Sequence, residues 1–508
     1  MFTLIALALF VAFIAFYRSG YRSNKLPSGP GGLPFVGNIF DLTTHESWRR
    51  AVQWGKEHGD MIYIRISGTR FIFLNSPNAV NDLLHARSSI YSDRPYLQMA
   101  CGLCGMGDLV PLTRYGGRLR YERRLMQNAL GPSAVEKWKR IVMKESYMLL
   151  QDLSASPEAY LSHIKRMAAS LIFATVYGYT IKSGDDPYVQ SAEEFMEVSS
   201  YAITAGWIVD FLPFLRWIPY TNFRRTAITW RAKLHDWIER PHMMFKGLPD
   251  SAMKRTSFCG NLLMSEGESS AFSDAPLEEH VKWIATSMYG AGSDTTVVTL
   301  CQFLLALVLN PKVQLKAQEE IDNAVGKSRL PCFEDRPRLP YVECVLKEVL
   351  RWGTPVPLTP PHRLTKRDEY RDYTFPEGTN FIANMWAILH DETMYPDPEK
   401  FSPERFEHSL DPLSHKASHD PMDYAFGFGR RRCPGIHFAN QSIWFVMVSI
   451  LACFDVKPAI DENGMEIMPP LIFAGGAFRH PKAFRCRITL RAEVEQDLIL
   501  TSLTACSA

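Results

Sequence analysis

The sequence predicts one large, mainly α-helical domain with small β-sheets, spanning residues 39–508. Helical periodicity of the apolar residues runs through most of residues 46–349, and few short runs there alternate as strands do. No long polar linker, charge block or low-complexity tract interrupts the 508 residues. Although the chain is longer than most single domains, these observations favour one hydrophobic core, crossed by a long central helix.

Residues 1–21 are expected to form an N-terminal membrane anchor. The run from Leu4 to Phe16 is almost wholly apolar, and Tyr17 and Arg18 can lie at the interface and extend it towards the ~20 residues of a typical span. A cleaved secretory signal is the alternative, but it carries positive charge before its apolar run, whereas Arg18 and Arg22 follow this one. The positive-inside rule then leaves the rest of the chain in the cytosol.

Residues 22–38 form a segment rich in proline and glycine. The prolines fix φ and remove hydrogen-bond donors, and the glycines disfavour a continuing helix. We expect a stiff hinge between the membrane and the domain, with an ordinary surface loop as the alternative.

Short strands are expected at both ends of the chain. The runs Met61–Ile66 and Arg70–Leu74 predict a β-hairpin, and residues 379–383 and 484–488 predict further short strands. These elements are too few for a β domain, so they add small sheets to a helical body.

A long helix is predicted between Pro276 and Asn310. Proline and two glutamates open it, and the Asn310-Pro311 pair stops it, which gives a helix roughly 50 Å long. Such a helix crosses the whole domain.

The middle of this helix contains Gly290 and Gly292 beside Asp294 and Thr295. Glycine weakens a helix, and buried polar groups cost free energy, so a functional groove would explain the pattern. The alternative is a kinked helix in which the threonines hydrogen-bond to their own backbone.

Cys433 lies in a loop of glycines and arginines directly before an apolar helical stretch. The helix N-terminus and the adjacent arginines favour a thiolate over a thiol. Gly427, Gly429 and Gly435 leave room for a flat, bulky group near the backbone. A reactive nucleophile and a buried small residue are the alternatives for Cys433.

Composition excludes some other classes. The net charge of +2 offers no concentrated basic stripe, so nucleic acid is not an expected partner. The ten cysteines show no repeated spacing and fit a reducing compartment rather than a disulfide framework. Cys101 and Cys104 form a C-x-x-C, but no second pair accompanies them, so a zinc or redox site is not expected there.

With these motifs in place, the sequence resembles the membrane-bound cytochromes P450, and the fungal members most closely. The family's haem-binding pattern is met at every fixed position, by Phe426, Gly429, Arg431, Cys433 and Gly435. The family's central-helix motif is matched from Ala291 to Thr296. Together with shorter matching motifs in the same order, the resemblance covers essentially the whole chain.

The resemblance implies a haem b whose iron takes the Cys433 thiolate as axial ligand. It implies that Asp294 and Thr295 are the catalytic acid and alcohol that manage proton delivery to oxygen. Beside the pattern residues, it implies cofactor contacts from Arg123, His362 and Arg363. One departure is that Leu119 stands where the family has a tryptophan, so one donor to a haem propionate is lost and Arg123 with His362 or Arg363 must carry more of that charge.

A third motif, Glu348-x-x-Arg351, places two opposite charges on one helix face. By resemblance, Arg405 of the Pro-Glu-Arg-Phe segment completes a buried network that supports the haem pocket. The expected role is structural.

The resemblance implies a monooxygenase that uses O₂ and NADPH-derived electrons. Because the chain has no flavin or dinucleotide motif of its own, the electrons are expected from NADPH-cytochrome P450 reductase, with cytochrome b5 as a second candidate donor. The expected location is the endoplasmic reticulum membrane, with the domain facing the cytosol. The arginines at 118, 120, 123, 124 and 430–432 either form a docking face or pair with propionates and local acids.

The substrate is expected to be lipophilic, such as a terpenoid or an aromatic secondary metabolite, because the family's substrate-contact positions are mainly apolar here. They include Ala291, Val356, Leu358 and Ala474. The apolar segment 211–219 is a second candidate membrane contact. Two other classes stay open: a haem-thiolate enzyme that rearranges an oxygenated substrate, which the intact Asp294-Thr295 pair disfavours, and a non-catalytic haem protein that senses or stores a ligand.

Overall fold

The fold is described by a computed structural model. It describes residues 25–507 except 35, 43–45, 182, 205, 265–274, 411–418, 475, 493 and 495. The expected anchor at residues 1–21 lies outside the described residues, as do residues 22–24 of the expected hinge.

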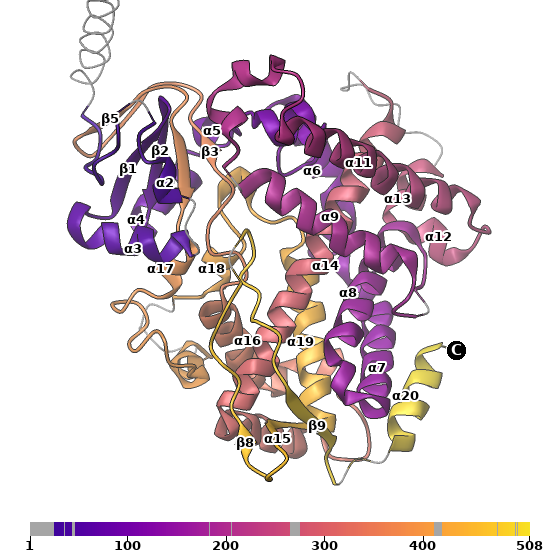
Figure 1. Cartoon of the computed structure of the whole chain (residues 1–508). Helices are drawn as coiled ribbons and strands as arrows, with labels where there is room; N and C mark the ends of the chain where they lie inside the picture. The colour runs from indigo at the N-terminus through magenta and orange to yellow at the C-terminus, as the bar shows by residue number, and fades with distance from the viewer. Residues whose placement is uncertain are drawn as a thin grey trace, which may run out of the picture.

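Helices make up most of the described chain (Figure 1). The long ones are α3 (Ser47–His58), α6 (Gly117–Leu130), α7 (Lys139–Ala155), α8 (Tyr160–Tyr177), α9 (Pro187–Thr204), α11 (Asn222–Gly247), α14 (Leu277–Leu309), α15 (Pro311–Val325), α16 (Pro340–Gly353), α19 (Ile436–Cys453) and α20 (Gln496–Ser507). The short ones are α2 (Ile39–Leu42), α4 (Pro77–Val80), α5 (Ser88–Tyr91), α10 (Ile208–Phe211), α12 (Ala252–Thr256), α13 (Phe258–Leu263), α17 (Met385–Leu389) and α18 (Met422–Ala425). Single turns of π- or 3₁₀-helix are η1 (Asn81–Ala86), η2 (Gln98–Leu103), η3 (Met106–Asp108), η4 (Val135–Trp138), η5 (Pro157–Ala159), η6 (Pro213–Trp217), η7 (Phe333–Arg338), η8 (Pro403–Leu410) and η9 (Gly429–Arg431).

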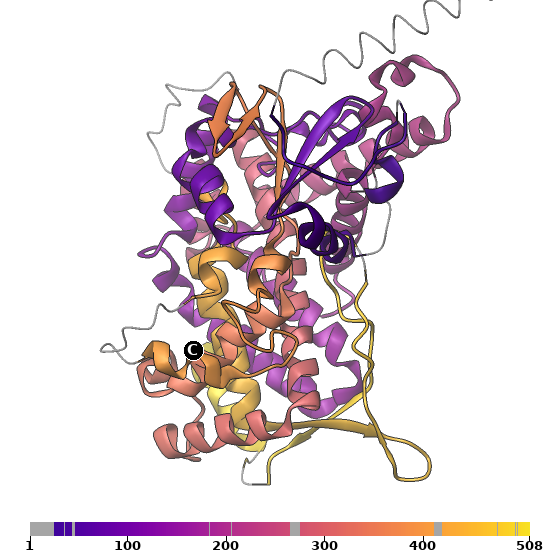
Figure 2. The ribbon, with the colours of Figure 1, turned by 90° about the vertical axis from the view of Figure 1, so that its left-hand side faces the viewer.

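Three small sheets accompany the helices. Their strands are β1 (Met61–Ile66), β2 (Thr69–Leu74), β3 (His362–Arg363), β4 (Asp368–Tyr370), β5 (Tyr373–Phe375), β6 (Asn380–Ala383), β7 (Phe454–Ile460), β8 (Glu466–Ile467) and β9 (Cys486–Leu490). The strand orders are β1-β2-β6-β3, β4-β5 and β8-β7-β9. The four-stranded and three-stranded sheets lie at opposite ends of the molecule in both views (Figures 1 and 2). The prediction of a mainly α fold with small sheets is confirmed.

The predicted hairpin forms as β1 and β2, with Met61 opposite Leu74. Its two-residue turn, Ser67-Gly68, has positive φ at both positions, as tight hairpins require. Successive residues of β1 face two different apolar clusters, so the hairpin is buried on both faces. Strand β2 also pairs in parallel with β6, which brings residues far apart in sequence to the sheet that carries His362.

The long central helix is α14, which begins after Pro276 and ends before Asn310, as predicted. Its 33 residues span roughly 50 Å, and most of them are buried in the main core cluster beside α8 and α19. Helices α14 and α19 are also the two in the described part of the chain that are long and apolar enough to cross a membrane. Both are mostly buried, as core helices are.

Gly290 and Gly292 allow close helix packing, and the functional groove expected beside this part of the helix stays a prediction. A Cβ at Gly290 would lie 2.3 Å from the ring of Phe195, and one at Gly292 would lie 2.6 Å from Ile172. These glycines therefore let α9 and α8 approach α14 closely.

The described part of the hinge is fastened to β1. The backbone N–H of Tyr63 donates to Ser28 (3.0 Å), and that of Asn38 donates to Arg65 (2.7 Å). A Cβ at Gly29 would collide with the carbonyl oxygen of Tyr63 at 1.8 Å. Residues 25–34 and 36–38 therefore lie along the edge of the sheet, and the role of this segment as a stiff hinge stays a prediction.

Candidate active site

Cys433 lies between η9 and α19, two residues before the helix cap Gly435. Its backbone N–H donates to Phe426 (2.7 Å), which closes the loop that the sequence motif marks. Gly427 and Gly429 have φ values of +73° and +53°, which glycine adopts without strain. A Cβ at Gly429 would lie 2.2 Å from the carbonyl oxygen of Leu84, so this glycine makes room for η1.

The environment of the Cys433 thiol has opposing effects on its pKa. Burial is the largest effect and raises the pKa, whereas the backbone of Gly435 and the positive charges of Arg123 and Arg432 lower it. The sequence expectation named only the lowering influences. An electrophile bound at sulfur, such as a metal ion, would complete the deprotonation.

A cluster of four basic side chains converges from separate segments of the chain, and we call it the basic cluster: Arg94, Arg123, His362 and Arg431. Arg94 donates to the carbonyls of Pro111, Pro360 and Pro361 at 2.7–2.9 Å. Arg431 donates to the carbonyls of Ser92, Val110 and Thr113, at 2.6–3.4 Å. Arg123 donates to the carbonyl of Arg432 at 2.6 Å.

The members of the basic cluster oppose one another electrostatically. Burial, followed by the charge of Arg123, lowers the pKa of Arg431 to about 10. Burial, followed by the charge of Arg431, lowers the pKa of Arg94, and burial followed by the charge of Arg94 lowers that of His362. The hydrogen bonds recorded for the three guanidinium groups in the described chain all end on carbonyl oxygens. Burying a positive charge that donates to neutral carbonyls alone costs free energy, so we expect these guanidinium groups to bind an anion.

Arg363 is directed to a different partner from the one expected. Its guanidinium lies 3.3 Å from Asp93, which also pairs with Arg114 at 3.0 Å. His362 is buried, and its Nδ1 lies 2.8 Å from the carbonyl oxygen of Tyr91, so in the neutral ring this nitrogen carries the hydrogen. Of this adjacent pair, only His362 faces the basic cluster.

The two catalytic candidates on α14 face different surroundings. Thr295 is half-buried, and its hydroxyl donates to the carbonyl of Ala291 (2.7 Å), which leaves the oxygen lone pairs free to accept. Thr296 and Thr299 bond back to the helix in the same way, so this part of the alternative interpretation holds. Asp294 instead lies 3.2 Å from His480, a residue that sequence reasoning missed.

The expected ion network is fully assembled. Arg351 donates to both carboxylate oxygens of Glu348, at 2.7 and 2.8 Å, and both side chains are completely buried. Arg405 adds a bond to the same carboxylate at 3.2 Å, and the backbone N–H of Ser402 adds one at 2.7 Å.

A comparison with protein families gives the site its context. The sequence model of the family described as "Cytochrome P450" matches residues 27–484. The chain belongs to the cytochrome P450 family. Because its relatives in that family include named monooxygenases at high identity, this P450 is a monooxygenase.

Individual relatives agree with this family. The P450 is 52% identical to the cytochrome P450 monooxygenase claT of Ampulloclitocybe clavipes, over 94% of each chain. It is 34% identical to the tryptamine 4-monooxygenase of Psilocybe cyanescens, over 93% of this chain and 94% of that protein. A zebra fish cytochrome P450 solved with abiraterone matches with a TM-score of 0.70 over 87% of this chain and 99% of its own, at 24% identity, which shows the shared fold.

The residues of this P450 fit a haem. Cys433 offers a sulfur ligand at the start of α19, and the arginines of the basic cluster offer donors whose charge Asp93 offsets only in part, at Arg94 and Arg431. Two haem propionates would supply further negative charge, and Arg94, Arg123 and Arg431 would hold them. His362 would add a donor at Nε2 in its protonated form, because Nδ1 carries the hydrogen of the neutral ring. Leu119, at the position where a donor is lost, is buried in the apolar core. Bound haem with a thiolate ligand supplies oxygen activation and O–O cleavage.

A cavity of about 790 Å³ lies beside α14, between α8, α9, α11 and the loop before β9. Ser293, Asp294 and Val297 line it, whereas Ala291 and Thr295 do not. Successive residues of an α-helix are rotated by about 100° around its axis. The cavity therefore lies on a different side of α14 from Ala291 and Thr295. The four expected substrate contacts, Ala291, Val356, Leu358 and Ala474, all lie outside its lining.

Proposed function

We propose that this P450 hydroxylates a C–H bond of a lipophilic small molecule. Substrate, O₂, two electrons and two protons yield the hydroxylated product and one water. The observation that carries the proposal is the combination of Cys433 at the start of α19 with the basic cluster of buried cations. The proposed cofactor is haem b, with Cys433 as its iron ligand.

The proposed substrate is a terpenoid or an aromatic secondary metabolite. Ala291 is exposed although it lies in the middle of a buried helix, so this side of α14 is not covered by protein. Val356 and Leu358 are half-buried apolar side chains that can complete a lipophilic wall with Ala474. A relative at 34% identity is named for its action on tryptamine, an aromatic amine, which supports the aromatic option.

We propose Thr295 as the alcohol that positions a proton for oxygen, because its hydroxyl oxygen can accept a hydrogen bond on the open side of α14. In Thr295→Ala, the share of consumed NADPH that appears as hydrogen peroxide is expected to rise several-fold. Thr295→Ser should restore coupling, and Thr296→Val, which removes the neighbouring hydroxyl, should leave it unchanged. Peroxide and NADPH measured together during turnover decide this; equal peroxide yields in Thr295→Ala and wild type would remove Thr295 from proton delivery.

The proposed electron donor is NADPH-cytochrome P450 reductase, or cytochrome b5 for part of the electrons. Arg120, Arg124 and Arg430 are exposed, and each lies over a tyrosine ring at 5.3–5.9 Å. Arg123 and Arg431 belong to the basic cluster, and Arg118 pairs with Asp108 and Glu122, so these three are already engaged. The proposed docking face therefore contains fewer arginines than the sequence predicted.

Charge reversal at this face tests the reductase contact. Arg124→Glu is expected to raise the KM for reductase about tenfold at low salt, and less at high salt, because screening weakens steering. Lys312→Glu is the matched control, since this exposed lysine of α15 lies at the other end of the molecule (Figure 1). Titration of NADPH oxidation against reductase measures both variants, and equal shifts in the two would contradict a specific face.

Attachment to the endoplasmic reticulum is proposed through residues 1–21. A second contact is proposed around α10 and η6, where large apolar side chains are exposed to solvent: Ile208, Phe214, Trp217, Ile218 and Tyr220. Removal of residues 1–21 then leaves part of the protein bound to membranes.

Asp210 of α10 ties this segment to η2 and makes its stability dependent on pH. The carboxylate accepts a hydrogen bond from the backbone of Met99 (2.7 Å), while burial raises the pKa of Asp210 to about 6. The folded protein therefore binds more protons than the unfolded chain between the ordinary aspartate pKa of 3.8 and about 6, so the free energy of unfolding falls as pH rises through that window.

Asp210→Asn is expected to remove that fall, because the amide stays neutral and still offers an oxygen to Met99. The gain in the free energy of unfolding should reach at most about 3 kcal/mol above pH 6 and shrink towards pH 4. Urea unfolding at pH 5 and pH 8 measures it. An equal gain at both pH values would mean that ionisation of Asp210 is not the cause.

The first experiment for the proposed function is the carbon monoxide difference spectrum of the reduced, full-length protein, followed by a screen of terpenoids and aromatic amines for spectral binding. A thiolate-type Soret band and substrate-dependent NADPH use with reductase are expected. Conversion of an oxygenated substrate without NADPH would favour a haem-thiolate enzyme that rearranges its substrate. Spectral binding of a compound without any NADPH use would favour a non-catalytic haem protein that senses or stores a ligand.

A further inference from the structure

His480 is held rigidly opposite α14 by its neighbour Arg479. The buried guanidinium of Arg479 donates to the carbonyls of Trp352 (3.0 Å) and Gly353 (2.7 Å), and it lies 3.5 Å from the ring centre of Phe473. The backbone carbonyl of Arg479 accepts a hydrogen bond from Gln302 of α14 at 2.8 Å. The loop that carries His480 is therefore fixed to the same helix that carries Asp294.

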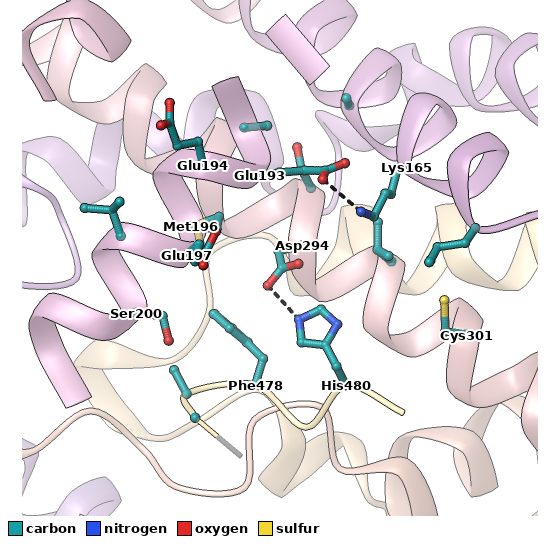
Figure 3. A pocket seen from close by; sticks show the side chains of 18 of the residues that line it. Lys165, Glu193, Glu194, Met196, Glu197, Ser200, Asp294, Cys301, Phe478 and His480 are labelled. Atoms are coloured by element: carbon teal, nitrogen blue, oxygen red, sulfur yellow. Dashed lines mark hydrogen bonds and ion pairs between the residues drawn. The ribbon is translucent and has the colours of Figure 1, made fainter. Parts of the chain in front are cut away.

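From this position His480 contacts Asp294. Its Nε2 lies 3.2 Å from Oδ2 of the carboxylate, and the two side chains point towards each other across the mouth of the cavity (Figure 3). Their side chains are 38% and 22% exposed, so the imidazole is open to water while the carboxylate is more enclosed. The imidazole is thus the outer member of the pair.

The cavity around this pair contains charged groups from three other elements. Lys165 of α8 pairs with Glu193 of α9 at 2.8 Å, and Lys233 of α11 pairs with Glu194 of α9. Glu197 of α9 is exposed and adds a further carboxylate to the lining. Two lysines thus face three glutamates, and this excess of acid attracts protons and cations to the water that fills the cavity.

We infer that His480 is a positioning residue that orients the Asp294 carboxylate and connects it to the water of this acid-lined cavity. The inference rests on the proposed role of Asp294 in proton delivery. The 3.2 Å contact, the clamp at Arg479 and the cavity on the same flank of α14 carry it. His480 acts on the reaction through Asp294, the residue that it contacts.

The proton balance of the reaction defines what this route must carry. Reduction of O₂ by two electrons takes up two protons, whether the second product is water or the oxygen leaves as hydrogen peroxide. In each transfer, the imidazolium form of His480 passes its Nε2 proton to the Asp294 carboxylate and becomes a neutral imidazole, which then takes up a proton delivered from bulk solvent through the cavity water. Asp294 then delivers its proton across α14 and returns to the carboxylate form, so neither residue is consumed.

NADPH oxidation by the full-length haem-loaded protein tests this in the presence of a compound from the spectral screen that stimulates it, because hydroxylation and peroxide release each consume two protons. With reductase in excess, His480→Ala is expected to slow NADPH oxidation about tenfold, less than the roughly hundredfold or greater effect of losing the group that protonates the reacting oxygen, because cavity water still reaches Asp294 without the imidazole. The ratio of rates in H₂O and D₂O should rise. His480→Gln keeps a donor for Asp294 and should recover part of the rate.

The dependence on pH separates proton passage from simple support of the fold. Both His480 variants are expected to differ from wild type in the pH dependence of the rate, because an imidazole exchanges protons with water and the alanine and glutamine side chains do not. Lys165→Gln breaks an ion pair in the same cavity wall and should retain the wild-type rate and pH profile. Equal carbon monoxide Soret bands, and equal rates of first reduction trapped by carbon monoxide, establish that haem loading and electron delivery are unaltered.

The outcomes are distinct. If wild type fails to oxidise NADPH with reductase, the proposed function is wrong. If wild type is active and His480→Ala matches it in rate, isotope ratio and pH profile, the inference about His480 is wrong while the proposed function stands. If His480→Gln keeps the wild-type pH profile, the titrating group lies elsewhere and the connection to cavity water through His480 is refuted.

Discussion

Cys433→Ala is expected to abolish the thiolate-type carbon monoxide spectrum of the reduced protein and all NADPH-dependent turnover. Alanine removes the sulfur but retains the backbone bond from residue 433 to Phe426 that closes the loop. The basic cluster remains, so some haem can still be retained without its axial ligand. The Soret position reads the ligand directly, because a thiolate pushes electron density onto iron in a way that other ligands do not.

A second cysteine provides the control. Cys486 in β9 is half-buried, as Cys433 is, and burial likewise raises the pKa of its thiol. Cys486→Ser should therefore keep the thiolate-type band, whereas Cys433→Ser should lose it with almost no change in side-chain volume. Retention of the band in Cys433→Ala would overturn the assignment of the iron ligand, and circular dichroism distinguishes a lost ligand from a lost fold.

Local patterns made the main elements predictable. The hairpin β1–β2 could be anticipated because two short runs of β-branched and aromatic residues stand close together in the sequence, and α14 because Pro276 and Asn310 mark its two ends. The loop at Cys433 could be found because its glycines must occupy special backbone conformations, whichever fold surrounds them.

Contacts between distant segments could not be anticipated from such patterns. Arg94 binds carbonyls of Pro111 and Pro360, 17 and 266 residues away, and no local signal marks it as part of the basic cluster. His480 meets Asp294 across 186 residues, in a loop whose course is set by the burial of Arg479. The sequence predicts the same haem-contact role for the neighbours His362 and Arg363. The fold directs His362 towards the basic cluster and Arg363 towards Asp93.

Glu348 is expected to be the residue whose loss destabilises the fold most. Its completely buried carboxylate binds Arg351 through two hydrogen bonds and Arg405 through one, and it accepts the backbone N–H of Ser402. Glu348→Ala leaves the fully buried Arg351 without a counter-charge. The expected loss in the free energy of unfolding is about 3–5 kcal/mol, a large part of the total stability of most domains.

A neighbouring ion pair on the same helix supplies the matched comparison. Glu343 of α16 binds Arg336 through two bonds of 3.0 Å, but both side chains are partly exposed, so Glu343→Ala should cost about 1 kcal/mol or less. Urea unfolding of both variants, monitored through the disappearance of the thiolate-type band, measures the two losses in the free energy of unfolding. Similar losses would mean that water reaches Arg351 once Glu348 is gone. A loss confined to Glu348→Ala places the cost in the buried site, where Arg351, Arg405 and the backbone N–H of Ser402 lose their shared acceptor, whereas Glu343→Ala removes two hydrogen bonds from one partly exposed arginine.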